Sequence, residues 1–278
     1  MKRILTAAIG VPLALAANFL LPEWGFFLMM LAVHAGCTIE YLRIARPRAP
    51  QAPLAALHLL VPAVAVGLWL VASGRVAPSP FYLLVLAALL APGVSTLILL
   101  ARAPLDQTLP ALGIMAFGVP YLALPTVAFA RLQAIDPWLT FLLVAIVWLG
   151  DTAAFYVGSR WGRRKLAPMV SPKKTWEGAA AGLLTGVLAT AVWSVCQLGA
   201  LDPRVLALGA LTAVAGQLGD LVESMLKREA GVKDSGGLLP GHGGILDRMD
   251  ATLFASPVLL IGAWLLGFDT VVHPSVLR

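Results

Sequence analysis

The chain has 278 residues, of which 59% are hydrophobic and only 12% are charged, and its mean hydropathy is +0.87. An ordinary soluble domain has about 45–50% apolar and about 25% charged residues, so this composition excludes a water-soluble globular protein. The net charge of +6 arises from 20 Lys and Arg against 14 Asp and Glu. The sequence therefore predicts a polytopic integral membrane protein of the all-α class.

Nine apolar segments are each about long enough to cross a membrane as an α-helix. Such a helix needs roughly 20 apolar residues to span about 30 Å of hydrocarbon. We place the segments at 4–21, 24–42, 53–73, 81–101, 108–130, 137–157, 177–199, 204–226 and 251–268. The first, fourth and fifth contain proline or glycine, which can kink or break a helix. The predicted fold is a helical bundle of about nine transmembrane helices.

The distribution of positive charge gives this bundle an orientation, because Lys and Arg are retained in short cytoplasmic loops. With the N-terminus inside, sixteen of the 20 basic residues fall in inside segments. The outside segments carry Arg75, Arg131, Arg204 and Arg278. We therefore predict an N-in, C-out arrangement with the polar loops 158–176 and 227–250 on the cytoplasmic face.

Residues 1–135 are predicted to form a scaffold of N-terminal transmembrane helices. The start of the chain is similar to a signal peptide, but no convincing cleavage site follows, so we expect it to remain as the first helix. His34, Glu40 and His58 lie in or at the ends of spans, where such groups more often pack than catalyse. Cys37 and Cys196 fall within spans, which argues against a disulfide framework or a zinc site. A lipid-facing groove in this half is an open option.

Residues 136–278 are predicted to be the catalytic region, and Asp151 is its first sign. This carboxylate lies nine residues before Arg160, on the order of 13 Å inside the end of its helix. An acid at that depth must face protein, water or a metal ion. The loop 158–176 that follows carries six Lys and Arg. These cations suit phosphate oxygens, although enforcement of topology or contact with anionic headgroups explains the first part of the loop equally well.

The end of that loop has the composition of an anion-binding helix start. The run Ser171-Pro172-Lys173-Lys174-Thr175-Trp176-Glu177-Gly178 places hydroxyls, paired lysines and a carboxylate where the seventh span begins. Backbone N–H groups at a helix N-terminus attract anions, and such hydroxyl and carboxyl side chains favour helix starts. We therefore interpret this run as a phosphate-binding segment.

The eighth span carries a polar stripe. Asp220, Glu223, Ser224 and Lys227 stand at i, i+3, i+4 and i+7, so they share one helical face. The stripe enters the membrane from the end that we predict to be cytoplasmic. It leads directly into the loop 227–250.

The loop 227–250 interleaves glycines with basic residues and His242. Glycine lets the backbone approach a ligand closely, as phosphate-binding loops require. Asp247 and Asp250 follow at i and i+3 on one face of the ninth span. Paired acids beside a basic, glycine-rich loop suit a divalent cation that bridges phosphates. A self-neutralising network of salt bridges is the alternative.

Two spaced runs in this loop resemble the signature of the phosphatidate cytidylyltransferase, or CDP-diacylglycerol synthase, family. They read Ser224-x-x-Lys227-Arg228-x4-Lys233-Asp234 and Pro240-x-His242-Gly243-Gly244-x-x-Asp247-Arg248-x-Asp250. The blocks 151–154 and 171–178 are also similar to that family, so the resemblance covers about residues 145–252. It implies the transfer of CMP from CTP to phosphatidic acid in phospholipid biosynthesis, with release of pyrophosphate and a requirement for Mg²⁺.

The resemblance, together with the chemistry of the side chains, assigns roles to these residues. The metal ligands would be Asp220 and Asp247 first, and then Asp250 and Asp151. The catalytic group would be Asp220, Asp247, Lys227, Asp250 and His242. Substrate would be bound by Ser171, Lys173, Lys174, Thr175, Ser224, Arg228, Lys233, Asp234 and Arg248. Because a phosphate monoester is largely ionised near neutral pH, His242 is expected to donate to phosphate or organise the loop rather than abstract a proton.

The expected partners are CTP, phosphatidic acid and membrane lipids, and no nucleic acid. A second cation and a homodimer are left open. The expected location is a bacterial inner membrane with the active site on the cytoplasmic side. Two rival functions are a CTP-dependent kinase of a polyprenol or similar lipid alcohol, which would release CDP, and a secondary transporter, whose expected inverted repeats are absent from the sequence.

Overall fold

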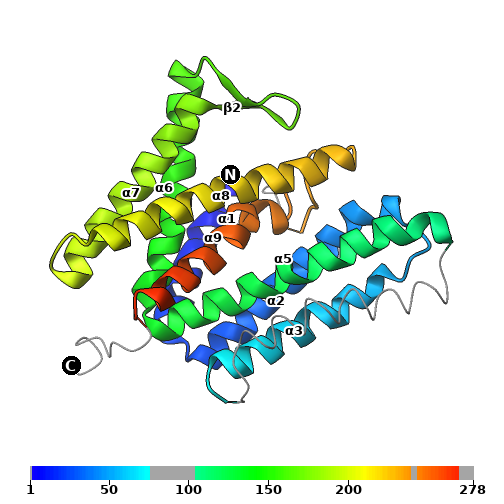
Figure 1. Cartoon of the computed structure of the whole chain (residues 1–278), viewed down its shortest axis with the longest axis horizontal. Coiled ribbons are helices and arrows are strands. Elements are labelled where there is room, and N and C mark those ends of the chain that lie inside the picture. Colours follow the sequence, from blue (N-terminus) through cyan, green and yellow to red (C-terminus); the bar gives the residue numbers. More distant parts are fainter. Residues whose placement is uncertain (1, 76–103, 239–242, 269–278) are drawn as a thin grey trace. The chain divides into compact units, whose positions relative to one another are not determined.

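The computed structural model describes residues 2–75, 104–238 and 243–268, and these are mostly helical (Figure 1). The long helices are α1 (Lys2–Leu20), α2 (Glu23–Ala45), α3 (Leu57–Ala72), α5 (Thr108–Ile135), α6 (Pro137–Trp161), α7 (Trp176–Leu198), α8 (Pro203–Glu229) and α9 (Leu246–Leu265). Short 3-10 turns occur at Arg46–Arg48, Leu54–Ala56 and Leu105–Gln107. Two strands, β1 (Lys165–Ala167) and β2 (Ser171–Thr175), complete the elements.

Seven of the described helices are long and apolar enough to cross a membrane. They correspond to the second, third and fifth to ninth segments that the sequence predicts. The first segment is also helical, as α1, and the fourth, 81–101, lies outside the described residues. The polytopic helical class is therefore confirmed, whereas the count of nine and the N-in, C-out orientation stay predictions.

The hairpin of β1 and β2 is a departure from the all-α expectation. The strands are antiparallel, with Lys165 opposite Thr175 and Ala167 opposite Ser171. Two local features keep this segment extended. Pro172 disfavours helical backbone in the residue before it, and Thr175, as the N-cap of α7, has φ −131° and ψ 155°. The cytoplasmic loop predicted at 158–176 thus contains a small sheet.

The described chain forms two compact units. Unit 1 comprises residues 1–131 and 226–249, and unit 2 comprises 132–225 and 250–278. The division into 1–135 and 136–278, with a catalytic role for the second part, stays a prediction. Whether the first half serves only as a scaffold stays a matter of prediction.

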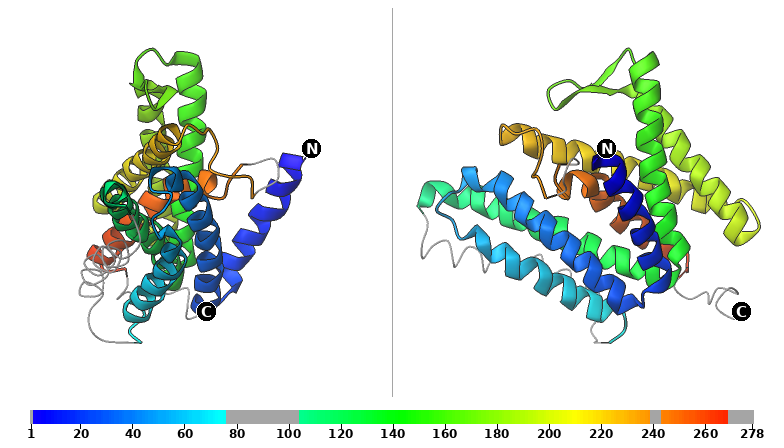
Figure 2. Two further views of the ribbon diagram at one scale, coloured as in Figure 1. Left: turned by 90° about the vertical axis from the view of Figure 1, so that its right-hand side faces the viewer. Right: turned by 180° about the vertical axis from the view of Figure 1, so that it is seen from behind.

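In unit 1, helices α2, α3 and α5 lie side by side (Figures 1 and 2). Glu23, at the start of α2, joins the ends of the other two. Its carboxylate accepts hydrogen bonds from Trp69 at 3.0 Å and from Arg131 at 2.9 Å, and Arg75 lies 3.7 Å away. Because α3 and α5 both end where α2 begins, both run antiparallel to α2.

The opposite end of unit 1 is joined by a second set of polar contacts. Arg48 forms an ion pair of 3.2 Å with Glu229, and the backbone nitrogen of Gln51 donates to Gln107 at 3.0 Å. With the predicted N-terminus inside, all of these residues would lie on the cytoplasmic face, and Arg75 and Arg131 on the opposite face. The contacts agree with that alternation of helix directions.

A groove of about 540 Å³ opens in unit 1 between α2, α5 and the end of α8. Its lining is mostly apolar and includes Ile44, Phe117 and Leu226, with Arg48 and Glu229 at its polar side. Most of its lining comes from residues 1–135, for which the sequence left a lipid-facing groove open, and the entry of lipid there stays a prediction.

In unit 2, α6 and α7 pack antiparallel, and the β1–β2 hairpin connects them (Figure 2). Glycines allow their close approach. A Cβ added at Gly150 would lie 3.3 Å from the Gly182 carbonyl, and one at Gly178 would lie 2.7 Å from the Ala154 carbonyl. Small residues at such contacts are typical of helix packing in membranes. This seam fixes the helix that carries Asp151 against the start of α7.

Candidate active site

In unit 2, a lysine of the hairpin meets the polar stripe of α8. Lys174 Nζ lies 2.5 Å from Asp220 Oδ2, and each side chain is 27% exposed. On the other side of the same carboxylate, Ser224 Oγ donates to Asp220 Oδ1 at 3.4 Å. We call Lys174, Asp220, Ser224 and their electrostatic neighbour Asp151 the Asp220 cluster. It combines one ammonium group with two carboxylates, as a phosphate and metal site would require.

The local sequence explains why Lys174 reaches α8. The next residue, Thr175, is buried and caps α7, its hydroxyl accepting a hydrogen bond from the backbone nitrogen of Gly178 at 3.2 Å. Such caps typically stabilise a helix by about 1 kcal/mol. The cap holds β2 at a fixed position on α7. The predicted contact of Thr175 with phosphate stays untested, but this hydroxyl already has a structural task.

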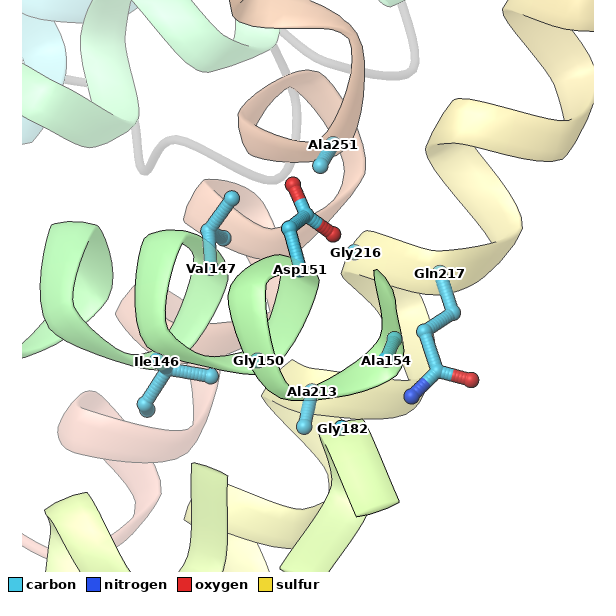
Figure 3. A pocket seen from close by; sticks show the side chains of 10 residues that line it. All are labelled: Ile146, Val147, Gly150, Asp151, Ala154, Gly182, Ala213, Gly216, Gln217 and Ala251. Atoms are coloured by element: carbon cyan, nitrogen blue, oxygen red, sulfur yellow. The ribbon is translucent and has the colours of Figure 1, made fainter. Parts of the chain in front are cut away.

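Asp151 borders a small cavity that is lined by residues of α6, α7 and α8 and by Ala251 of α9 (Figure 3). The cavity is about 20 Å³, roughly the room that one water molecule needs. Apart from Asp151 and Gln217, its lining is apolar or glycine. In Figure 3 the Asp151 carboxylate extends toward Ala251, while Gln217 points away to donate to the Ala179 carbonyl at 3.0 Å. Asp151 is thus an exposed residue of α6 that borders a mostly apolar cavity, and the expectation that it faces protein, water or a metal ion stays a prediction.

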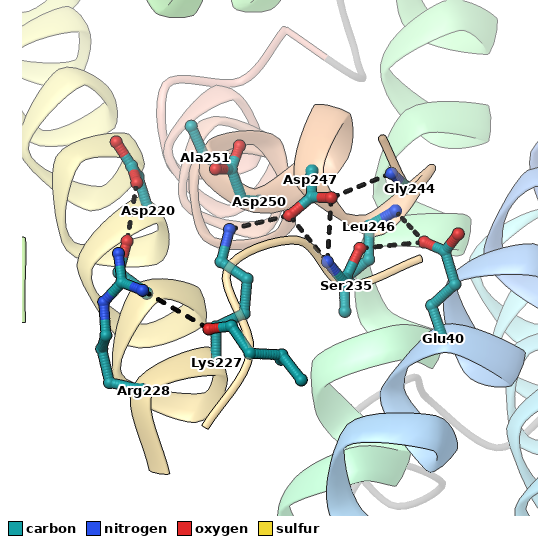
Figure 4. A network of polar contacts seen from close by, with 12 residues as sticks. Glu40, Asp220, Lys227, Arg228, Ser235, Gly244, Leu246, Asp247, Asp250 and Ala251 are labelled. Carbon is teal, nitrogen blue, oxygen red and sulfur yellow. Dashed lines mark hydrogen bonds and ion pairs between the residues drawn. The ribbon is translucent and has the colours of Figure 1, made fainter. Parts of the chain in front are cut away.

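In unit 1, Asp247 organises the start of α9 and the loop before it (Figure 4). Its Oδ1 accepts a hydrogen bond from Lys227 Nζ at 2.7 Å. Its Oδ2 accepts from the backbone nitrogens of Ser235 at 3.0 Å and Gly244 at 2.9 Å. The Lys227 and Asp247 side chains are only 13% and 9% exposed. We call Lys227, Ser235, Gly244 and Asp247 the Asp247 cluster.

Glu40, which the sequence analysis interpreted as a packing or interfacial group, adjoins the Asp247 cluster. It is 2% exposed, and its Oε2 accepts hydrogen bonds from Ser235 Oγ at 3.1 Å and from the backbone nitrogen of Leu246 at 2.8 Å. Sequence reasoning missed both Glu40 and Ser235 as parts of this region. The available signal was an acid inside an otherwise apolar span, which is a functional hypothesis by default.

The remaining predicted site residues are more open. Lys173, Arg228, Lys233, Asp234 and Arg248 are exposed, and Ser171 is half-buried. Arg228 donates to the Val232 carbonyl at 3.4 Å, which shapes the turn after α8. Asp250 is half-buried in the first turn of α9. His242 lies outside the described residues, so its role stays a prediction.

The comparison with known proteins covers both clusters. A model of the cytidylyltransferase family matches residues 1–266. The chain belongs to the cytidylyltransferase family. Every residue of the Asp220 and Asp247 clusters lies within the segment that this cytidylyltransferase model matches.

Individual relatives of this cytidylyltransferase-family chain bear the name phosphatidate cytidylyltransferase. The protein of Haemophilus influenzae is 33% identical in an alignment that covers 92% of this chain and 96% of the relative. The protein of Bacillus subtilis is 43% identical over 156 residues, and that of Staphylococcus epidermidis is 48% identical over 117 residues. These two matches cover 55% and 42% of this chain, and the chain spans about half of each relative, 58% and 45%.

Proposed function

We propose that the protein is a phosphatidate cytidylyltransferase, which transfers CMP from CTP to phosphatidic acid in phospholipid biosynthesis. The main support is the match over 92% of the chain to a relative of that name. The site geometry supports it further, because two basic side chains of the family-like motifs, Lys174 and Lys227, each contact an aspartate of the segment 145–252 that the resemblance covers. Such groups suit a substrate that carries several phosphates.

The reaction needs positioned charge more than proton transfer. A phosphate oxygen of phosphatidic acid attacks the α-phosphorus of CTP, a new P–O bond forms, and the bond from the α-phosphorus to the bridging oxygen breaks as pyrophosphate leaves. The attacking phosphate is already largely ionised near pH 7, so no strong general base is required. The basic residues that the family resemblance assigns to the site would neutralise the triphosphate and the departing pyrophosphate. They are Lys173, Lys174, Lys227, Arg228 and Lys233. Catalysis would thus rest on orientation and electrostatic stabilisation.

The described residues fit a requirement for Mg²⁺, which proteins commonly bind through one or two carboxylates plus substrate phosphates. Asp220 and Asp151 offer carboxylate oxygens within the Asp220 cluster. Among the described residues no group of three or more His, Cys, Asp or Glu could hold a metal ion, so phosphates would have to complete the coordination. When bound, Mg²⁺ would offset the negative charge of those phosphates.

Asp247 and Asp250 also stay predicted metal ligands on the grounds of sequence. Asp247 already accepts hydrogen bonds from Lys227, Ser235 and Gly244. A metal ion at Asp247 would therefore have to share its carboxylate with Lys227 or displace it. The same holds for Asp220, whose carboxylate contacts Lys174, so both carboxylates stay first-choice ligands.

We further propose a bacterial inner membrane as the location, with the clusters on the cytoplasmic side, where CTP arrives from water. The bias of sixteen basic residues to one set of loops supports this side. Phosphatidic acid would present its headgroup at the same interface while its acyl chains stay in lipid.

The decisive experiment follows both products in one assay. The protein is purified in detergent and supplied with CTP, phosphatidic acid and Mg²⁺, and pyrophosphate and lipid-linked CMP are measured together. Equal amounts of the two products, dependent on Mg²⁺, are expected. Release of CDP with a lipid alcohol as acceptor would instead identify a kinase. The absence of nucleotide turnover with either lipid would refute the proposal.

A further inference from the structure

Glu40 lies in the apolar helix α2, yet its carboxylate is almost completely buried, with 2% of the residue exposed. Burying a carboxylate is unfavourable unless hydrogen bonds compensate for the lost water. Its Oε2 has two such bonds, and Oε1 has no hydrogen-bond partner among the residues that the structure describes. A buried acid held in this way asks for an explanation beyond packing.

The two hydrogen bonds of Glu40 reach the loop 227–250 at two points, Ser235 and Leu246. Ser235 precedes the signature run that starts at residue 240, and Leu246 is the first residue of α9. One carboxylate oxygen of α2 therefore contacts the loop on both sides of the segment 236–245. These contacts join residues about 200 positions apart in the sequence.

Ser235 links Glu40 to Asp247. Its hydroxyl donates to Glu40 Oε2 at 3.1 Å, and its backbone nitrogen donates to Asp247 Oδ2 at 3.0 Å. In Figure 4, Ser235 lies between the two carboxylates, and Lys227 approaches Asp247 from the other side. Any shift of Ser235 would consequently move the carboxylate that Lys227 contacts.

Two glycines of the loop pack so closely against the Glu40 carboxylate that a side chain would not fit. A Cβ added at Gly236 would overlap the Glu40 carboxylate, and one at Gly244 would overlap both Glu40 and Ser235. The backbone of the loop can approach the acid this closely only where a side chain is missing. Gly244 belongs to the family-like signature, so part of that signature is fitted to Glu40.

We propose that Glu40 is a positioning residue of the cytidylyltransferase reaction, which acts by holding Ser235, Leu246 and thereby Asp247 in place. The proposal rests on the proposed function for its catalytic consequence. Glu40 reaches the Asp247 cluster only through Ser235 and the backbone at the start of α9. Glu40 lies outside the signature motifs, so the proposal adds a residue to the site that those motifs predict.

The test uses the full-length protein with the variants Glu40→Gln, Glu40→Ala and Ser235→Ala. Thr38→Ala is the matched control, because Thr38 is also a buried polar residue of α2 but donates only to the His34 carbonyl of its own helix. Steady-state kinetics give kcat and KM for CTP, and hydrogen exchange measures protection of the segment 231–249.

We expect Glu40→Ala to lower kcat/KM on the order of 10²-fold, since small misplacements of catalytic groups have effects of that size. Glu40→Gln keeps one acceptor oxygen and should recover part of the loss. Glu40→Ala combined with Ser235→Ala should be little worse than Glu40→Ala alone, because both remove the same link. Faster exchange within 231–249 should accompany each loss, and Thr38→Ala should show neither effect.

Unchanged exchange of 231–249 in folded Glu40→Gln and Ser235→Ala would overturn the proposal, whatever the activity. Activity losses that a fall in thermal stability fully accounts for would overturn it as well. If Glu40→Ala does not fold, the other two variants still decide. An inactive wild-type protein would refute the proposed function instead, and the exchange measurement would continue to report on the positioning contact.

Discussion

Lys227 Nζ lies 2.7 Å from Asp247 Oδ1, and the contact joins the last turns of α8 to the first turn of α9. Both side chains are largely buried, so the pair is screened little by solvent. Removing one member of such a pair leaves the other charge uncompensated. The contact thus makes the positions of the two residues depend on each other.

Asp247→Asn is expected to lower turnover by at least about 10²-fold. The substitution removes the negative charge that pairs with Lys227 and that would bind the predicted metal ion. The assay compares pyrophosphate release by the variant and the wild-type protein in detergent. Asp106→Asn is a matched control, since Asp106 is exposed and lies in a 3-10 turn outside both clusters. Near-wild-type turnover in a folded Asp247→Asn protein would show that this carboxylate has no catalytic part.

The two neighbouring lysines of β2 should differ in importance. Lys174 is 2.5 Å from Asp220, whereas Lys173 is exposed. Lys174→Gln leaves Asp220 without its cation, so we expect it to lower kcat/KM about tenfold more than Lys173→Gln does. Measurement of kcat/KM for CTP with both variants tests the order. Equal effects would mean that the observed ion pair contributes nothing specific.

The ion pairs of Glu23 should matter for stability and not for turnover. Its carboxylate is 20% exposed and accepts one charged hydrogen bond from Arg131 at 2.9 Å and a neutral one from Trp69. Hydrogen bonds to charged groups contribute about 1.5–3 kcal/mol. Glu23→Gln is therefore expected to lower the melting temperature in detergent by several degrees while kcat stays within about twofold. A large fall in kcat at unchanged melting temperature would contradict this assignment.

The helices could be predicted from sequence because apolar length is a local property. The segment predicted at 137–157 is found as α6, Pro137–Trp161, and the one at 204–226 as α8, Pro203–Glu229. Both helices continue past the apolar run, since polar residues with long side chains, such as Lys227, are compatible with helical backbone. The β1–β2 hairpin was not predicted, because its pairing depends on two strands too short to show a period.

The candidate site was predictable only in part, for a related reason. Spacing along one helix placed Asp220 and Lys227 on a common face without any knowledge of the fold. The contact of Glu40 with Ser235 spans 195 positions, and no periodic pattern in a single sequence indicates such a pair. The role of Thr175 as a helix cap was partly predictable from sequence. Its position before Glu177 and Gly178 indicates a helix start, but a cap and a phosphate ligand look the same in sequence.

The close seam between α6 and α7 allows a last prediction, which concerns Gly178. A Cβ at this position would lie 2.7 Å from the Ala154 carbonyl, a contact that backbone atoms cannot avoid without moving. Gly178→Ala should therefore force α6 and α7 apart and displace the lysines of β2, which directly precedes α7. Overpacking of this kind typically destabilises by about 1–3 kcal/mol, so we expect a melting temperature lower by several degrees and reduced turnover. Gly67→Ala is the matched control, because a Cβ there meets nothing within 4 Å and alanine favours the helix. Identical behaviour of the two variants would show that the glycine seam does not determine the distance between the helices.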